Sequence, residues 1–509
     1  MLAAGAALVA GVDRLHSLYR PIVEDYDRVP DRDIPVTRTR VGLNLTGLAT
    51  FNRQQVFTNL IAQGEWFSAE GDGWKPFPAG QLDEKGWVRF LKPGQTAPRS
   101  LTVPQAPFRE RIVRCTYKGT GTIDVGGIAS LLDRGDHMLT MRLAITGSEE
   151  EGAWIELMKT DPTDPVRDID CRETNRPATE RFHPDFVAFV SRFAILRFLD
   201  WQKVNDNADV SWAHRPRPDS SSQAGQAGVS VEDMVDLANR VAADPWFLMP
   251  YRADDAYIEG FARLVHDRID PARTVYVELG NEIWNDLFDA ARQAEAEGRA
   301  LGLGGGDAGV GQGERYAQKL TSVMRIWTRV FADRPNRLVR VAAAHNANPD
   351  GASVILGFRD TAQWVDALAT APYVWLDIDG YGAGDVNRIY ARTDAAIEEA
   401  IAMAQRHRQT AARFGKRFIA YEGGQHLVTP NMPLAMDLQR DPRMGDLYSR
   451  YLRRWNAAIH SDLVLYASTA PIAEYGAWGL QEYGGQPIED APKLRAVQGF
   501  IASLPKKGR

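Results

Sequence analysis

The chain contains very little cysteine, and this scarcity limits the chemistry that it can support. Only Cys115 and Cys171 occur among 509 residues, so neither a disulfide-stapled miniprotein nor a four-cysteine zinc site is possible. The two cysteines pair in an oxidising compartment or stay as two separate buried thiols, and both interpretations remain open. The nine histidines show no His-Glu-x-x-His or other paired spacing, so we expect no metal site and no cofactor.

The chain also lacks an excess of positive charge and long hydrophobic runs. Its formal net charge is −6 with no long basic run, which argues against a nucleic-acid partner. The one membrane-like segment, Met1 to Val12, is shorter than the roughly 20 residues that span a bilayer. It is either the remnant of an export signal or anchor, which we favour, or a plain N-terminal helix. We therefore expect a secreted, periplasmic or membrane-anchored extracytoplasmic protein with membrane contact only through this segment. Its oligomeric state does not follow from the sequence.

Residues 71–178 have the pattern of an antiparallel sheet. Hydrophobic residues make up 44% of the chain, which allows a large core. Short alternating runs such as Arg111–Tyr117 and Met138–Leu143 are separated by glycine-rich turns and show no helical periodicity. This spacing is typical of an antiparallel β-sandwich.

The rest of the chain alternates strands with helices. We expect a first segment over 1–38, the first part of a barrel over 39–70, the β-sandwich insertion over 71–178, and the remaining barrel over 179–509. Eight strands with helical crossovers indicate a closed (β/α)₈ TIM barrel. The alternative, an open doubly wound sheet, requires a nucleotide-binding switch-point motif that we do not find. The expected strands are a first one at Val41, then Phe193–Phe198, Trp246–Pro250, Thr274–Leu279, Leu338–Ala343, Val374–Asp379, Arg417–Tyr421 and Leu463–Ala467.

Two of these strands end in acidic residues. The fourth expected strand, Thr274–Leu279, is followed by Gly-Asn-Glu, which contains Asn281 and Glu282, and the seventh, Arg417–Tyr421, is followed by Glu422. Functional residues of such barrels lie at the carboxyl ends of the strands, so both carboxylates are expected at one mouth. Glycoside hydrolysis by double displacement needs one carboxyl that donates a proton and one that attacks, roughly 5–5.5 Å apart.

On these residues the chain resembles the clan of retaining (β/α)₈ glycosidases that includes cellulases, mannanases, xylanases and arabinofuranosidases. The resemblance covers roughly residues 40–66 and 180–500, and it singles out no one family. It implies that Glu282 is the acid/base, that Glu422 is the nucleophile, and that Asn281 holds the sugar hydroxyl next to the anomeric carbon.

The same resemblance implies three supporting residues. Arg197, at the end of the second strand, would keep the nucleophile ionised, and Tyr381, past the expected sixth strand, would hydrogen-bond it. Trp478, past the eighth strand, would form the aromatic floor of the sugar subsite. Many clan members carry a histidine near the third strand or after the fourth. In this chain those places hold Tyr251, Arg252, Ile283 and Trp284. Because of this departure from the clan pattern, the resemblance does not identify the sugar.

Other residues near the strand ends have two interpretations each. Each of them either contacts the sugar or is a structural side chain of the barrel rim. These residues are Trp201, Trp212, Trp284, His345, Gln425 and His426. Trp284 could also supply part of the apolar surround that raises the pKa of an acid/base. Glu278 faces the same side of its strand as Glu282, and we expect it to be a buried, hydrogen-bonded barrel residue.

Taken together, the residues predict a retaining O-glycoside hydrolase that acts on a polysaccharide or an oligosaccharide. If a sugar hydroxyl replaces water, the same site is a transglycosylase. A non-catalytic carbohydrate-binding protein is the competing class, although both carboxylates are retained. A sugar-phosphate enzyme on the same barrel would need a phosphate-binding turn, for which Gly423-Gly424 is a weak candidate.

Overall fold

The structure is a computed structural model, and it describes residues 38–49, 52–71, 73–103, 106–148 and 151–505. The predicted signal or anchor segment at Met1 to Val12, and nearly all of the first predicted segment, lie outside these residues. Among the described residues, no helix has the length and apolar character needed to cross a membrane.

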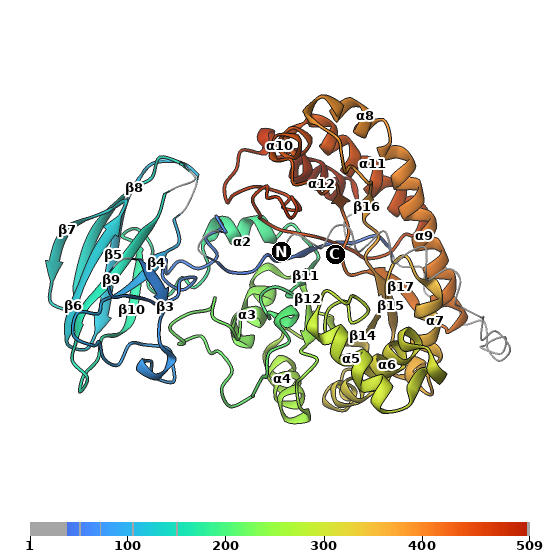
Figure 1. The fold of residues 1–509 in the computed structure, drawn as a ribbon, viewed down its shortest axis with the longest axis horizontal. Helices are drawn as coiled ribbons and strands as arrows, with labels where there is room; N and C mark the ends of the chain where they lie inside the picture. Colours follow the sequence, from blue (N-terminus) through green and yellow to red (C-terminus); the bar gives the residue numbers. More distant parts are fainter. Residues whose placement is uncertain (1–37, 50–51, 72, 104–105, 149–150, 506–509) are drawn as a thin grey trace.

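Eight parallel strands close into a barrel in the order β1-β11-β12-β13-β14-β15-β17-β19, which confirms the predicted TIM barrel (Figure 1). The strands are buried almost throughout, because the barrel core covers one face and the surrounding helices cover the other. They are β1 (Val41–Asn44), β11 (Ile195–Arg197), β12 (Asp244–Met249), β13 (Val275–Leu279), β14 (Leu338–Ala343), β15 (Ala367–Thr370), β17 (Arg417–Ala420) and β19 (Leu463–Leu465).

The helices follow the strands along the chain and pack outside the barrel. In α3, the Ser230 side chain accepts a hydrogen bond from the backbone N–H of Asp233, as its capping pattern predicts, and the helix buries Met234 and Leu237. The α-helices are α2 (Pro184–Val190), α3 (Val231–Val241), α4 (Asp255–Arg268), α5 (Asp289–Ala300), α6 (Ala308–Val330), α7 (Pro349–Gly357), α8 (Val386–Tyr390), α9 (Thr393–Arg413), α10 (Met432–Arg440), α11 (Pro442–Ala458) and α12 (Pro492–Ser503). The 3₁₀ turns are η1 (Ala79–Gln81), η2 (Val204–Asp206), η3 (Leu303–Gly306), η4 (Pro335–Arg337), η5 (Thr361–Trp364), η6 (Ala383–Asp385) and η7 (Ile488–Asp490).

The sixth barrel strand is not the predicted one. The barrel uses β15 (Ala367–Thr370), whereas the predicted run contributes β16 (Val374–Trp375), which pairs with β18 (Gln425–His426) outside the barrel. The sequence of β15 is Ala-Leu-Ala-Thr, with one large apolar side chain, so its strand signal is weak. In the more hydrophobic run after it, Val374, Leu376 and Ile378 are buried, whereas Trp375 between them is exposed.

Between β1 and β11 the chain forms antiparallel sheets that project to one side of the barrel, as the predicted insertion requires (Figure 1). One sheet has the order β10-β5-β8-β7 and the other β4-β9-β6, and side chains such as Leu139 and Leu157 bury between them in a core of their own. The predicted limits at 71 and 178 stay a prediction. The strands are β2 (Phe67–Ala69), β3 (Trp74–Pro76), β4 (Ala97–Leu101), β5 (Glu110–Lys118), β6 (Gly121–Gly127), β7 (Ala129–Gly135), β8 (Met138–Ala144), β9 (Ala153–Thr160) and β10 (Arg167–Glu173).

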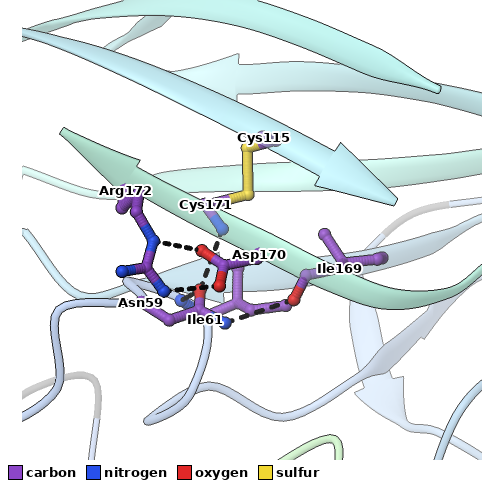
Figure 2. Close-up of a disulfide and its surroundings, with 7 residues drawn as sticks. All are labelled: Asn59, Ile61, Cys115, Ile169, Asp170, Cys171 and Arg172. Atoms are coloured by element: carbon purple, nitrogen blue, oxygen red, sulfur yellow. Dashed lines mark hydrogen bonds and ion pairs between the residues drawn. A yellow bond between two sulfur atoms is a disulfide. The ribbon is translucent and has the colours of Figure 1, made fainter. Parts of the chain in front are cut away.

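The two cysteines are paired and lie in these sheets. Cys115 on β5 and Cys171 on β10 are direct partners in neighbouring antiparallel strands and form a disulfide (Figure 2). Next to it, the Asn59 side chain accepts a hydrogen bond from the Cys171 N–H at 2.9 Å and donates one to the Ile169 carbonyl at 3.2 Å. The chain segment that leaves β1 is thus attached to the same edge of the β-domain.

Candidate active site

A single buried arginine organises the mouth of the barrel. Arg197 is the last residue of β11, it is fully buried, and protein acceptors take all of its nitrogens. Nε and Nη2 donate to the Glu278 carboxylate at 3.0–3.1 Å. Nη1 donates to Glu422 Oε1 at 2.9 Å and to Asn44 Oδ1 at 3.0 Å, and Nη2 donates to Asn281 Oδ1 at 2.9 Å. A guanidinium has five N–H donors, so none is left for a ligand.

Glu422 lies two residues past the last residue of β17, Ala420, at the carboxyl end of the barrel. Its side chain accepts a hydrogen bond from Arg197 on Oε1 and one from the Tyr373 hydroxyl on Oε2, both at 2.9 Å. Burial raises the pKa of the Glu422 carboxyl above 4.5, while Arg197 and the Tyr373 hydroxyl act in the opposite direction. The direct contact with the Arg197 cation and the Tyr373 hydroxyl favours the charged form of Glu422.

Glu282 lies beside Glu422 in a different environment. It follows β13 at a sharp turn and has a φ of +48°, in the left-handed region that non-glycine residues rarely adopt. Asn285 donates to its Oε2 at 2.9 Å, and the Tyr421 hydroxyl donates to its Oε1 at 3.2 Å. Burial and the negative charge of Glu422 raise the pKa of Glu282 to about 7. The half-buried carboxyl is therefore suited to carry a proton near neutral pH.

Hydrogen bonds fix the side chains of Asn281 and Glu278, which lie next to Glu282 and Glu422. Asn281 accepts from Arg197 and donates to Asn205 Oδ1 at 3.1 Å, so its side chain is fixed next to Glu282. Glu278 is fully buried and accepts hydrogen bonds from Arg197 and from the Trp246 indole, as expected of a structural barrel residue. Burial raises the pKa of Glu278 to about 7.

Tyr373, rather than Tyr381, hydrogen-bonds Glu422. The Tyr381 hydroxyl accepts a hydrogen bond from Arg392, and its ring lies under Arg388 and Arg392. This correction follows from the shift of the sixth strand, because Tyr373 comes three residues after the true strand β15. With β15 placed correctly, the same rule of a tyrosine past the sixth strand would have found Tyr373.

A row of aromatic rings lies beside Glu422. The Tyr373 and His426 ring centroids are 5.4 Å apart, those of His426 and Trp478 are 5.8 Å apart, and those of Trp478 and Tyr466 are 5.9 Å apart. Trp478 and His426 are half-buried. Partly exposed aromatic faces next to a carboxylate form a surface on which a sugar ring can stack.

A second aromatic pair lies next to Glu282. The Trp284 and His345 rings stack with centroids 4.0 Å apart. Burial lowers the pKa of His345 to about 4, so this histidine is neutral at physiological pH. The predicted residues Trp284 and His345 therefore meet in one place, on the Glu282 side of the site.

Two predicted sugar contacts are structural instead. Trp201 is 1% exposed and packs between Phe186 and Phe198 in the barrel core, with its indole donating to the Thr46 carbonyl. Gln425 is also 1% exposed, and its two side-chain atoms bind the Ala477 carbonyl and the Leu427 N–H. In both cases the side chain points away from the solvent that a sugar would replace.

Three site residues were missed by the sequence interpretation. Asn44 ends β1 and accepts from Arg197, and Asp200 lies just past β11, where the Tyr466 hydroxyl donates to its Oδ2 at 3.3 Å. The end-of-strand rule that found Glu422 applies equally to Asn44 and Asp200, whereas Tyr466 is identified only by the packing.

Within the described part of the chain, no group of three or more His, Cys, Asp and Glu side chains is placed to hold a metal ion.

The chain was compared with protein-family models, with curated proteins and with solved structures, and only solved structures match. No family model and no curated protein matches the sequence. Solved structures that match include a 4-O-α-L-rhamnosyl-β-D-glucuronidase from Fusarium oxysporum (12% identity, TM-score 0.39, covering 63% of this chain and 65% of that one). A β-glucosidase from Thermotoga maritima matches at 11% identity and a TM-score of 0.34, covering 63% of this chain and 86% of that one. A β-xylosidase from Caulobacter crescentus matches at 13% identity and a TM-score of 0.37, covering 62% of this chain and 64% of that one.

The structural neighbours are thus glycosidases by name. This chain spans less than two thirds of the Fusarium and Caulobacter enzymes. At these identities and TM-scores, the fold of this chain rests on its own strand order, and a reaction for it has to come from its own side chains.

Proposed function

We propose that this protein is a retaining glycoside hydrolase that cleaves a polysaccharide or an oligosaccharide. One observation carries the proposal: two neighbouring carboxyls at one barrel mouth have opposite environments. Glu422 contacts a cation and a tyrosine hydroxyl, whereas Glu282 contacts neutral donors and feels the charge of Glu422. Paired carboxyls with different proton affinities are what acid-assisted glycoside cleavage needs.

In the first step, a Glu422 oxygen bonds to the anomeric carbon while the bond from that carbon to the leaving oxygen breaks. The proton of Glu282 moves to the leaving oxygen, and an ester joins the sugar to Glu422. In the second step, Glu282, now ionised, takes a proton from water, whose oxygen replaces Glu422 at the anomeric carbon. Asn281, fixed by Arg197 and Asn205, is placed to bind the hydroxyl next to the anomeric carbon.

We further propose that the protein works outside the cytoplasm. The disulfide between Cys115 and Cys171 supports this location, because disulfides persist in oxidising compartments and are rare where thiols are kept reduced.

The covalent intermediate is the decisive test. We expect an activated 2-deoxy-2-fluoro glycosyl fluoride of matching sugar type to add one glycosyl unit to Glu422, detected by peptide mass spectrometry. The matched control is Glu422→Gln, which should take up no label. Hydrolysis of a glycan panel that survives Glu422→Gln unchanged, or products with inverted anomeric configuration by NMR, would rule out the mechanism. Absence of hydrolysis and of labelling across the panel would favour a carbohydrate-binding protein.

A further inference from the structure

A cavity lies outside the barrel, where the β-domain meets the helices α2 and α12. Its volume is about 390 Å³, which is within the range of pockets that hold small ligands. The wall is formed by residues 53–55, by the start of β5, by α2, by the loop 481–488 and by α12. Figure 1 shows α2 on the side of the barrel that faces the β-domain. In the described part of the chain, the lining shares no residue with the candidate active site.

Five polar side chains of the lining are more than nine-tenths buried. They are Gln54, Gln55, Arg111, His183 and Gln481. Three of them leave one polar atom without a partner among the described residues, namely Gln55 Oε1, Arg111 Nε and His183 Nε2. Buried polar groups are nearly always hydrogen-bonded, because an unmade hydrogen bond costs free energy. A wall of this composition is therefore suited to a polar ligand.

The amide groups of the wall offer both donors and acceptors. Gln481 Nε2 donates to Gln54 Oε1 at 3.2 Å, which leaves Gln54 Nε2, a donor, and Gln481 Oε1, an acceptor, for other partners. On α12, Gln498 Oε1 accepts from Arg192 Nη1 at 3.3 Å, so the Gln498 N–H groups remain as donors. A hydroxyl group both donates and accepts, whereas an oxyanion only accepts and an ammonium group only donates. The mixture favours a ligand with several hydroxyls.

The charges of the wall do not favour an anion. Carboxylates accompany the cations, since Arg111 Nη1 lies 2.7 Å from Glu173 Oε1 and Asp185 lines the same cavity. An oxyanion would therefore meet negative charge as well as guanidinium groups, and this repulsion is absent for a neutral ligand.

The loop 481–488 keeps this surface open. The Gly484 N–H donates to the Arg53 carbonyl at 2.7 Å, which brings the loop against Gln54. A Cβ at position 484 would lie 3.0 Å from Gln54 Nε2 and would cover this donor. The half-buried Phe189 lines the same cavity and offers an aromatic face. A carbon ring that carries hydroxyls fits both kinds of surface.

We propose that this cavity is a second binding site, separate from the barrel mouth, and that its ligand is a neutral sugar unit. The site does not depend on the proposed reaction, because its residues are distinct from the carboxyl pair. A free saccharide and one unit of a longer glycan share the chemistry that the wall recognises.

Hydrogen–deuterium exchange followed by mass spectrometry tests where saccharides bind. The full chain carrying Glu422→Gln is used, so that the probes are not cleaved. The probes are cellobiose, xylobiose, mannobiose, lactose and maltose, and sodium sulfate stands for an anion. We expect at least one disaccharide to slow exchange in α2 and in the loop 481–488. Absence of protection there by every disaccharide, or equal protection by sulfate, would overturn the proposal.

Protection at this cavity and labelling at Glu422 fail separately. If Glu422 takes no label but a disaccharide protects α2, the proposed reaction fails and the second site stands. Cellohexaose, xylohexaose and mannohexaose then identify the source of the sugar. A hexaose that binds at least about tenfold more tightly than its disaccharide supports a unit of a glycan chain, and equal affinities support a free saccharide.

Variants at accessible positions show whether the cavity itself binds the sugar. Ala188 is an exposed residue of α2, so Ala188→Trp narrows the cavity without disturbing the core and should weaken binding at least about tenfold. Gln498→Leu keeps the volume but removes an amide donor, so it should weaken binding about five- to tenfold. The matched controls, Ala402→Trp and Gln405→Leu, are exposed on α9 and should leave binding unchanged. Affinity that survives Ala188→Trp, in a variant shown to be folded by circular dichroism, would place the sugar elsewhere and contradict the proposal.

Discussion

The two ends of the barrel each hold an arginine among carboxylates, but the balance of charge differs. At the amino end, Arg40 precedes β1, and its Nε lies 2.8 Å from Asp462 Oδ1 and its Nη1 2.6 Å from Asp244 Oδ2. Tyr276 donates to Asp462 at 2.8 Å, and Arg417 adds a second positive charge. Two cations therefore face two carboxylates. At the carboxyl end, in the part of the chain that the structure describes, Arg197 is the one cation that contacts Glu278 and Glu422.

The proton affinities of the carboxyls follow this balance. Asp462 is buried, yet its pKa lies below 3.8, because the attraction of Arg40 and Arg417 outweighs the cost of burial. Glu282 is half-buried, yet its pKa rises to about 7, because burial and the charge of Glu422 exceed the effect of its hydrogen bonds. The charges nearby, more than the degree of burial, thus give a fixed ion pair at one end and a removable proton at the other. In TIM barrels the amino end generally serves stability and the carboxyl end serves chemistry, and here charge balance accounts for that division.

The largest expected effect lies at the carboxyl end. Glu282→Gln removes the proposed proton donor but keeps the side-chain shape, so we expect kcat/KM for a glycan to fall by roughly 10²–10⁴-fold. The thermal midpoint should not fall, because the substitution removes a buried carboxyl that is costly to ionise. Activity is measured on the glycan, and stability by circular dichroism.

A leaving-group series sharpens this prediction. A 2,4-dinitrophenyl glycoside needs little protonation as it departs, so Glu282→Gln should slow its release much less than it slows glycan cleavage. An equal loss on both substrates would mean that Glu282 does not act as the acid.

The sequence predicted where most barrel strands end better than it predicted which side chains contact one another at those ends. Glu282, Glu422 and Arg197 were predicted correctly to lie at the barrel mouth, because each stands next to a strand rich in large apolar residues. The strand β15 has small side chains and was misplaced, which moved the expected tyrosine from Tyr373 to Tyr381. An error of a few residues in one weak strand therefore changed a contact at the site.

Other features depend on packing between segments that are distant in the chain. Asp200 and Tyr466 are 266 residues apart, and no local pattern links them. Trp201 follows a barrel strand, where a large aromatic side chain has the same sequence signature whether it enters the core or lines the mouth. The structure buries it against Phe186, a helix residue that comes after the β-domain.

The second prediction concerns the amino end. Asp462→Asn leaves the half-buried Arg40 with Asp244 as its remaining carboxylate, so we expect the free energy of unfolding to fall by about 2 kcal/mol. The value of kcat/KM, measured well below the unfolding temperature, should stay unchanged, because Asp462 lies at the opposite end of the barrel from Glu282. Unfolding is followed by urea titration. A large loss of kcat/KM in the folded variant would mean that the two ends are coupled.

The smallest effects come from pH, and they have opposite signs at the two ends. The reaction needs protonated Glu282, so kcat/KM should fall about tenfold per pH unit above about 7. The folded state binds this proton more tightly than the unfolded chain between pH 4.5 and about 7, so Glu282 lowers the free energy of unfolding as pH rises through that window.

Asp462 acts in the other direction. Its pKa is lowered by folding, so its stabilisation is present above pH 3.8 and is lost as pH falls through its lower pKa in the folded state. Urea titrations at pH 5 and pH 8 should therefore show Glu282→Gln gaining stability relative to the wild type as pH rises. Asp462→Asn should be equally destabilised at these two pH values and should approach the wild type only in further titrations below pH 3.8. If both variants changed with pH in the same direction, charge balance would not be what distinguishes the two ends, because a balanced and an acidic cluster must respond oppositely to protons.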